Sequence, residues 1–165
     1  PSMAFFRRIF DEVAREFPTV TTDRVYVDAM ALFLVQRPES FDVLVTENMF
    51  GDILSDLAAG IIGGMGMAPS ADVGETYGVF QPSHGTAPTI AGKGIANPIA
   101  MIASFAMCLR YSFNKVEEAD RLEKAIANVL DQGIRTGDIM AEGCRQVGTV
   151  EMGDAILAEF KALSA

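Results

Sequence analysis

Helical and strand-like segments alternate along the chain, and this alternation predicts an α/β fold built in layers. Half of the 165 residues are apolar, so one domain with a proper hydrophobic core is expected. Apolar residues recur at steps of three and four in several stretches, and short apolar runs lie between them. The sequence contains neither an internal repeat nor a low-complexity tract.

Each expected element has a local pattern behind it. Residues 3–17 place apolar side chains at helical spacing among charged ones, and Pro18 ends this amphipathic helix. Gly133 is expected to close the helix that follows Asn114. The patterns together predict helices that begin at or just after Met3, Asp28, Asp52, Asn97, Asn114 and Thr149, and strands at 24–27, 41–45 and 79–81.

Capping residues predict where the later helices begin. Asn97 followed by Pro98 is an N-cap with proline at the first helical position. Asn114 with Glu117 three residues later is a variant of the capping box, and Thr149 is expected to cap the last helix. The faces expected to point inward are Ile99, Ile102, Phe105, Ala106 and Leu109, then Val116, Ala119, Leu122, Ile126 and Val129, then Ile156, Leu157, Phe160 and Leu163.

Two aspartates, Asp52 and Asp56, lie four residues apart in one expected helix. Side chains at this spacing share one helix face with Cβ atoms about 5–6 Å apart, so the carboxylates repel unless a cation or solvent separates them. Oxygen ligands of this kind suit Mg²⁺ or Mn²⁺. An N-cap role for Asp52 beside a solvated Asp56 also explains the pair, and a cap is the local explanation for Asp28.

A long connection without regular structure runs from Pro82 to Pro98 and contains the only histidine, His84. Loops of this length in a compact chain are usually functional, although a lone loop histidine is more often a hydrogen-bonded surface residue. The glycine-rich run Gly63–Ser70 is expected to be a loop or hinge. No phosphate-loop or strand-flanked Gly-x-Gly-x-x-Gly pattern is present, so a purine would have to lie on free amides and loop edges.

The formal net charge of −9 argues against a nucleic-acid or anionic-membrane partner, because no basic stripe exists to neutralise phosphates. No apolar run reaches the length of a membrane span, and the first residues lack the pattern of a signal peptide. A cytoplasmic protein that acts on small molecules is therefore expected.

Four motifs, in this order and at this spacing, resemble the isocitrate/3-isopropylmalate dehydrogenase family. They are Tyr26–Ala31 (YVDAMA), Phe41–Asp56 (FDVLVTENMFGDILSD), His84–Pro88 (HGTAP) and Ala91–Pro98 (AGKGIANP). The resemblance covers essentially the whole chain and is closer to the isopropylmalate and tartrate/D-malate branches. It implies an isopropylmalate dehydrogenase-like layered α/β/α fold of which this chain is the C-terminal half. Residues 1–62 would end the metal-binding, dimer-forming lobe, and residues 63–165 would belong to the nucleotide-binding lobe.

The resemblance implies an oxidoreductase that uses NAD and Mg²⁺ or Mn²⁺ to oxidise, with decarboxylation, a 2-hydroxy dicarboxylic acid. By this analogy Asp52 and Asp56 bind the metal together with Asp28, which is also the catalytic residue. Asp28 would come from the other subunit of a homodimer, so the active site would be shared. The alternatives are a tartrate or D-malate dehydrogenase, or a non-catalytic nucleotide-binding subunit.

The resemblance also implies that the long loop binds the adenosine half of NAD, with His84 beside the adenine. The cofactor-binding residues would be His84, Gly85, Thr86, Ala87, Thr89, Ile90, Ala96 and Asn97. NAD-using members commonly have an aspartate where this chain has Thr89, so looser NAD binding is expected. The phosphate-binding positions of NADP-linked relatives are matched to Met152 and Ile156, which favours NAD.

The resemblance places the family's substrate-binding arginines and its catalytic tyrosine and lysine in segments that precede Pro1. This chain alone is therefore expected to be inactive, because it has no arginine cluster to pair with the substrate carboxylates.

Overall fold

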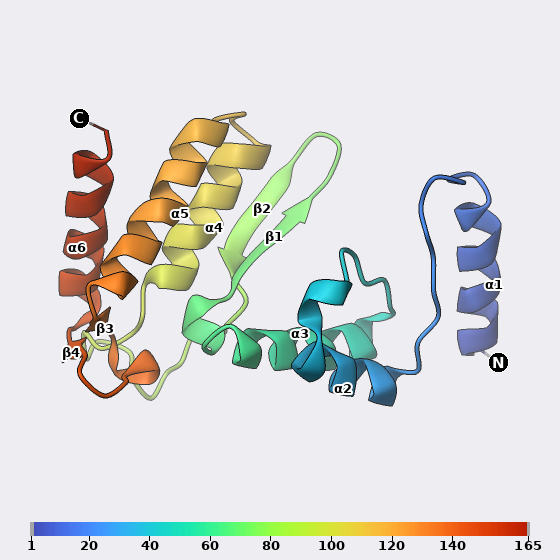
Figure 1. Ribbon diagram of the computed structural model, residues 1–165, viewed down its shortest axis with the longest axis horizontal. Helices are drawn as coiled ribbons and strands as arrows, with labels where there is room; N and C mark the ends of the chain where they lie inside the picture. The colour runs from blue at the N-terminus through green and yellow to red at the C-terminus, as the bar shows by residue number, and fades with distance from the viewer. Residues whose placement is uncertain (1, 165) are drawn as a thin grey trace. The chain divides into compact units, whose positions relative to one another are not determined.

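The computed structural model describes residues 2–164, and the chain divides into two compact units, Pro1–Leu44 and Val45–Ala165. The first unit contains α1 (Ser2–Ala14), α2 (Val27–Gln36) and the 3₁₀ turn η1 (Pro38–Ser40). The second unit contains α3 (Asn48–Ile61), η2 (Met65–Met67), β1 (Pro69–Val73), β2 (Gly78–Pro82), α4 (Ile99–Tyr111), α5 (Val116–Asp131), β3 (Ile134–Arg135), η3 (Gly137–Ile139), β4 (Arg145–Gln146) and α6 (Thr149–Ala162) (Figure 1).

Two predicted strands are wrong. Residues 24–26 belong to no strand, and α2 already begins at Val27. Residues 41–45 form no strand either. A strand exists only where a second strand takes its backbone hydrogen bonds, and neither segment has such a partner among residues 2–164. A composition rich in apolar and β-branched residues is therefore not enough to make a segment a strand.

The first unit keeps both of its predicted helices. Helix α1 ends at Ala14, three residues before the predicted end, and an ion pair between Asp11 and Arg24 ties it to the segment that follows. Helix α2 buries Met30 and Leu34.

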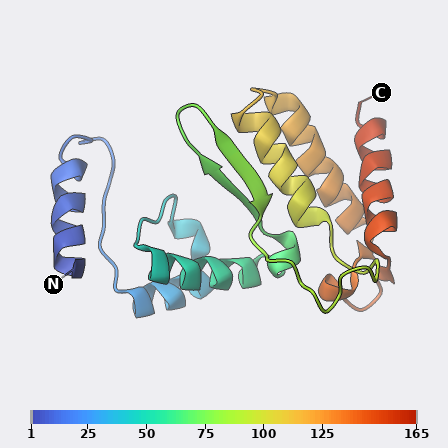
Figure 2. The same ribbon diagram turned by 180° about the vertical axis from the view of Figure 1, so that it is seen from behind.

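The core of the second unit lies among three helices, α4, α5 and α6, with α5 between the other two (Figures 1 and 2). Its buried residues are Ile99, Ala106, Ala119, Leu122, Ala125, Ile126, Val129, Val147, Met152 and Ile156. Most of the predicted inward positions are therefore confirmed. Four are wrong, because they face solvent at the edges of the helix faces: Phe105, Val116, Leu157 and Leu163.

A β-hairpin packs against α4. Strands β1 and β2 pair antiparallel from Pro69 opposite Pro82 to Val73 opposite Gly78, which confirms the strand predicted at 79–81. The run expected as a loop up to Ser70 instead contains η2 and the start of β1. Two-residue strands β3 and β4 pair in parallel. The mixture of helices and short sheets confirms the predicted α/β class.

Of four predicted helix boundaries, one is confirmed, one is shifted by a single residue and two are wrong. Pro98 rather than Asn97 is the N-cap of α4, although the Asn97 Oδ1 accepts the Ile99 N–H at 2.9 Å as a capping side chain does. Gly133 follows α5 with a φ of 78°. Asn114 caps nothing and lies in the turn before α5 with a φ of 52°, which asparagine tolerates better than most residues. Thr149 is the first residue of α6 rather than its cap.

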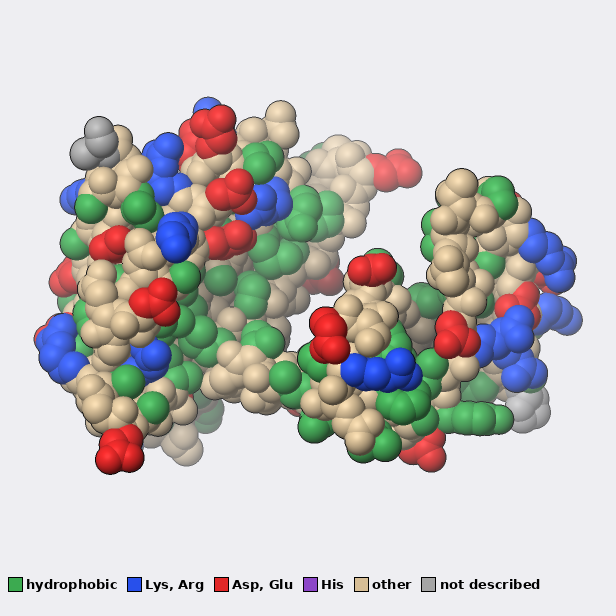
Figure 3. All heavy atoms as spheres, in the orientation of Figure 1, with side chains coloured by type: hydrophobic (Ala, Val, Ile, Leu, Met, Phe, Trp, Pro, Cys, Tyr) green, Lys and Arg blue, Asp and Glu red, His purple; other side chains and the backbone are tan. Residues whose placement is uncertain are grey.

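Charged side chains of both signs are mixed over the face shown in Figure 3. None of the helices among residues 2–164 combines the length and the hydropathy needed to cross a bilayer.

Candidate functional site

Helix α3 carries the predicted acidic pair and is capped by Glu47. The Glu47 carboxylate accepts the N–H groups of Met49 and Phe50, each at 2.9 Å. Asp52 therefore lies inside the helix, and the alternative that it serves as the N-cap is wrong. Its carboxylate is free of the capping role that would have competed with a metal.

The outer face of α3 presents both carboxylates to solvent. The helix buries Leu54 on the side away from the two aspartates, and Ala59 one turn beyond Asp56, whereas Asp52 and Asp56 are exposed. Neither carboxylate has a hydrogen-bond or ion-pair partner elsewhere in residues 2–164. Two unpaired carboxylates one helical turn apart form a donor set that fits a hard divalent cation.

Asp28 belongs to the other unit, where it lies in the first turn of α2. Its Oδ1 accepts the Ala29 N–H at 2.8 Å, so it satisfies one free amide, although the N-cap itself is Tyr26. Within either unit, and among the residues described, no three His, Cys, Asp or Glu side chains gather as a metal site. The three-aspartate ligand set stays a prediction, and in that prediction Asp28 comes from a second copy.

In the first half of the long loop, residues 83–91, Ser83 donates its N–H to the Ala68 carbonyl at 3.1 Å, and the residues after it are held by short-range contacts. His84 is half-buried, and its Nδ1 lies 2.8 Å from the carbonyl oxygen of Gly85. The Ile90 N–H donates to the Ala87 carbonyl at 3.0 Å. Gly85, Thr86, Ala87 and Thr89 are exposed, so their backbone and side chains are open to a ligand.

The second half of the loop, residues 92–98, is held by the start of α6. Thr149 donates its N–H to the Gly94 carbonyl at 2.9 Å and its hydroxyl to the Ala96 carbonyl at 2.5 Å. A Cβ on Gly148 would lie 2.8 Å from the Gly94 oxygen, so only glycine allows this approach. The two loop halves are therefore anchored very differently.

The side chain of Asn97 makes polar contacts with three other residues. Besides capping α4, it donates from Nδ2 to Asp138 Oδ2 at 3.1 Å and contacts the Met67 sulfur at 3.5 Å. Because these contacts occupy the polar atoms of the Asn97 side chain, an adenine bound here would contact the Asn97 backbone. Asp138 was not predicted as a site residue, because the sequence pattern there indicates only a turn.

One prediction about the cofactor is wrong. Met152 is fully buried and Ile156 is 2% exposed, both in the core between the helices. Neither can meet a cofactor phosphate, so these are not the positions that distinguish NADP from NAD. The expected NAD preference loses this support.

Comparisons with known proteins identify the family of this chain. Residues 2–156 match the isocitrate/isopropylmalate dehydrogenase family. The 3-isopropylmalate dehydrogenase of Rhizobium etli is 66% identical in an alignment of 157 residues that covers 91% of this chain and 42% of that protein. The 3-isopropylmalate dehydrogenase of Pseudomonas putida is 53% identical over 98% of this chain and 45% of its own length.

Solved structures give the same result. The crystal structure of isocitrate dehydrogenase from Methylococcus capsulatus superposes with a TM-score of 0.88 and 43% identity, over 96% of this chain and 46% of that chain. The chain thus spans less than half the length of the curated relatives and of the solved structure described here. It belongs to the isocitrate/isopropylmalate dehydrogenase family.

Proposed function

We propose that this chain supplies the metal-binding helix and the nucleotide loop of a decarboxylating dehydrogenase that uses NAD and Mg²⁺ or Mn²⁺. The substrate would be a 2-hydroxy dicarboxylic acid of the 3-isopropylmalate type, as the names of the Rhizobium and Pseudomonas relatives suggest. The observation that carries the proposal is the pair of unpartnered carboxylates on α3, whose capping work is done by Glu47.

In this proposal Asp52 and Asp56 hold the divalent ion together with Asp28 from the second copy in a homodimer. The spacing of the pair on α3 presets two oxygens on one face, so little side-chain ordering is needed when the ion binds. A bound divalent ion would act as a Lewis acid on the substrate hydroxyl. Residues 1–62 would accordingly finish the metal-binding lobe, and residues 63–165 would belong to the nucleotide lobe.

The nucleotide would lie along residues 84–97. The exposed residues in the first half of the loop are open to a ribose near Thr89. In this proposal His84, which is half-buried, would lie beside the purine ring. Thr89 offers the ribose a neutral hydroxyl, which makes a weaker contact than a carboxylate would. Moderate affinity for NAD and weak discrimination against NADP follow.

Fragment complementation tests the proposal. The chain is mixed with the part of the Rhizobium etli enzyme that precedes the matched region, and NAD reduction is measured with Mn²⁺ and 3-isopropylmalate, tartrate or D-malate. Turnover of one of these acids is expected. Asp52→Asn should reduce it by at least about 100-fold, because a metal ligand is lost.

The matched control is Asp154→Asn, which makes the same change at an exposed position on α6 and should leave turnover unchanged. Full activity in Asp52→Asn would end the metal assignment. NAD binding by the complemented wild type without turnover of any of the three acids would instead identify the chain as a non-catalytic nucleotide-binding subunit.

A further inference from the structure

The end of the nucleotide loop is held at one point by a carboxylate that the proposed reaction does not use. Asp138 lies in the middle of η3, 41 residues along the chain from Asn97, and its Oδ2 accepts the Asn97 amide at 3.1 Å. Asn97 in turn caps α4 through its other side-chain atom. A single side chain thus connects three separate segments of the second unit.

Asp138 is itself held in place. Its Oδ1 accepts the hydroxyl of Thr136 at 2.6 Å, and Thr136 is fully buried. The Ile139 N–H also donates to the Thr136 carbonyl at 3.2 Å, which closes the turn around the carboxylate. Although Asp138 is exposed on its outer side, both of its oxygens are directed by neighbouring groups, so it acts as a fixed acceptor.

A third segment, the η2 turn, packs closely against the contact between Asn97 and Asp138. A Cβ on Gly66 would lie 2.5 Å from Asp138 Oδ2 and 2.9 Å from the Asn97 Cβ. The η2 turn can pass here only because residue 66 has no side chain. The η2 turn, which lies in the predicted hinge, is therefore packed tightly against the end of the nucleotide loop at the Asn97 side chain.

We propose that Asp138 is the positioning residue for the nucleotide loop: its carboxylate fixes the Asn97 side chain and so sets the place of residues 94–97, on which nucleotide affinity depends. Removal of the carboxylate leaves the Asn97 Nδ2 without its charged acceptor, and the side chain then loses the orientation that caps α4. The inference rests on the proposed nucleotide role of the loop.

Exchanging the two residues provides the test. In Asn97→Asp two carboxylates would face each other, and in Asp138→Asn one oxygen must serve two donors, so each single variant breaks the contact. In the double variant Asn97→Asp/Asp138→Asn, the new amide donates to the new carboxylate, the Thr136 hydroxyl keeps an acceptor, and the net charge is unchanged. The hydrogen bond is restored with its direction reversed.

Two readouts are taken on the 165-residue chain under conditions where circular dichroism shows every variant folded. The dissociation constant for NAD is expected to rise about tenfold in each single variant and to recover in the double variant. Hydrogen exchange at the Ile99 amide should accelerate by a similar factor in the single variants and recover in the double, while amides of α5 stay unchanged.

Gly66→Ala should also weaken NAD binding and accelerate exchange at the Ile99 amide, because the added Cβ would push against Asp138 and Asn97. Gly60→Ala should change neither, because a Cβ at that position meets no neighbouring atom within 4 Å. Unchanged Ile99 exchange in Asp138→Asn, or a double variant no better than the single ones, would overturn the inference. If the wild-type chain does not bind NAD, the nucleotide role fails on its own, and the exchange rates still decide whether Asp138 positions the loop.

Discussion

The carboxylate of Glu47 accepts the N–H of Phe50 at 2.9 Å and so fixes the first turn of the helix that carries the acidic pair. Glu47→Ala should lower the free energy of unfolding by about 1 kcal/mol, as loss of an N-cap does. Urea unfolding measures the change. Glu47→Gln keeps one carbonyl oxygen as acceptor and should recover part of the loss; a Gln variant no more stable than Ala would mean that the cap contributes nothing.

Met152 fills the core between α5 and α6 without exposed surface. Met152→Ala should lower the free energy of unfolding by about 2–5 kcal/mol, because it removes buried methylenes and leaves a cavity. The control is Met101→Ala on α4, where the side chain is 55% exposed and the change should stay within about 0.5 kcal/mol. Equal effects at the two positions would contradict the observed packing.

Gly153 occupies the interior of α6, and a Cβ there would meet no atom within 4 Å. Gly153→Ala should therefore raise the free energy of unfolding by about 0.5–1 kcal/mol, since alanine restricts the unfolded chain and fits the helix. Thermal unfolding detects the gain as a higher midpoint. A lower midpoint would show that α6 packs more tightly at this position than the structure indicates.

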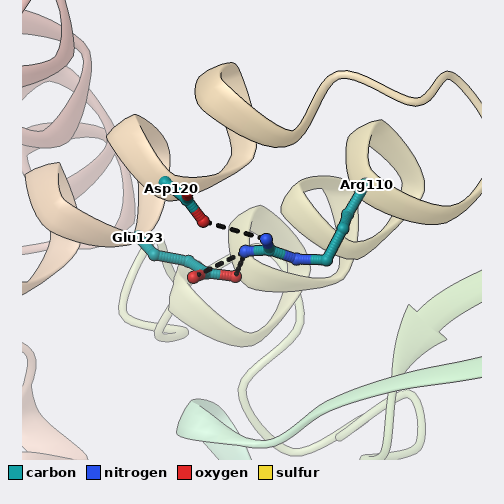
Figure 4. A network of polar contacts seen from close by, with 3 residues as sticks. All are labelled: Arg110, Asp120 and Glu123. Carbon is teal, nitrogen blue, oxygen red and sulfur yellow. Dashed lines mark hydrogen bonds and ion pairs between the residues drawn. The ribbon is translucent and has the colours of Figure 1, made fainter.

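Arg110 joins α4 to α5 through two carboxylates (Figure 4). Its Nη2 donates to both oxygens of Glu123 and its Nη1 donates to Asp120, all at 2.9 Å. Glu123, and then Asp120, raise the pKa of the guanidinium above its ordinary value. Arg110→Lys keeps the charge but loses the two-pronged contact, so a lower melting temperature is expected, with a further loss in Arg110→Ala.

The sign of the pKa shift determines how this loss depends on pH. A raised pKa in the folded state gives a contribution that is fully present below the unfolded pKa and is lost only as the pH rises through the folded one. The difference in melting temperature between wild type and Arg110→Ala should thus stay constant from about pH 7 to about pH 9. It should shrink with added salt, because the partners are largely exposed. A difference insensitive to salt would point to packing by the arginine stem.

The sequence was sufficient where a local pattern decides the structure. The spacing of Asp52 and Asp56 predicts a shared helix face, and Asn97 before Pro98 predicts the start of α4. Both depend on contacts within one or two helical turns. Phe105 and Leu157 were placed inward by the same periodicity and proved exposed, because spacing gives the direction of a face but not its width.

Predictions failed where the deciding contact is distant in sequence. The runs 24–27 and 41–45 have the composition of strands, yet composition supplies no pairing partner. Asp138 was missed because its role depends on a residue 41 positions away. The glycine at position 66 was a usable signal: three glycines within four residues indicate a close backbone approach, but not what approaches.

The unequal anchoring of the long loop has a consequence for how the nucleotide selectivity proposed for it would change. Thr149 secures Gly94 and Ala96, while residues 85–89 touch little of the core. In the proposed nucleotide site, mutations in that exposed stretch would alter which ribose substituents are tolerated without disturbing the folding of the three-helix core. Residues 85–89 can thus change in sequence during evolution while Gly94 and Ala96 keep the loop attached to the start of α6.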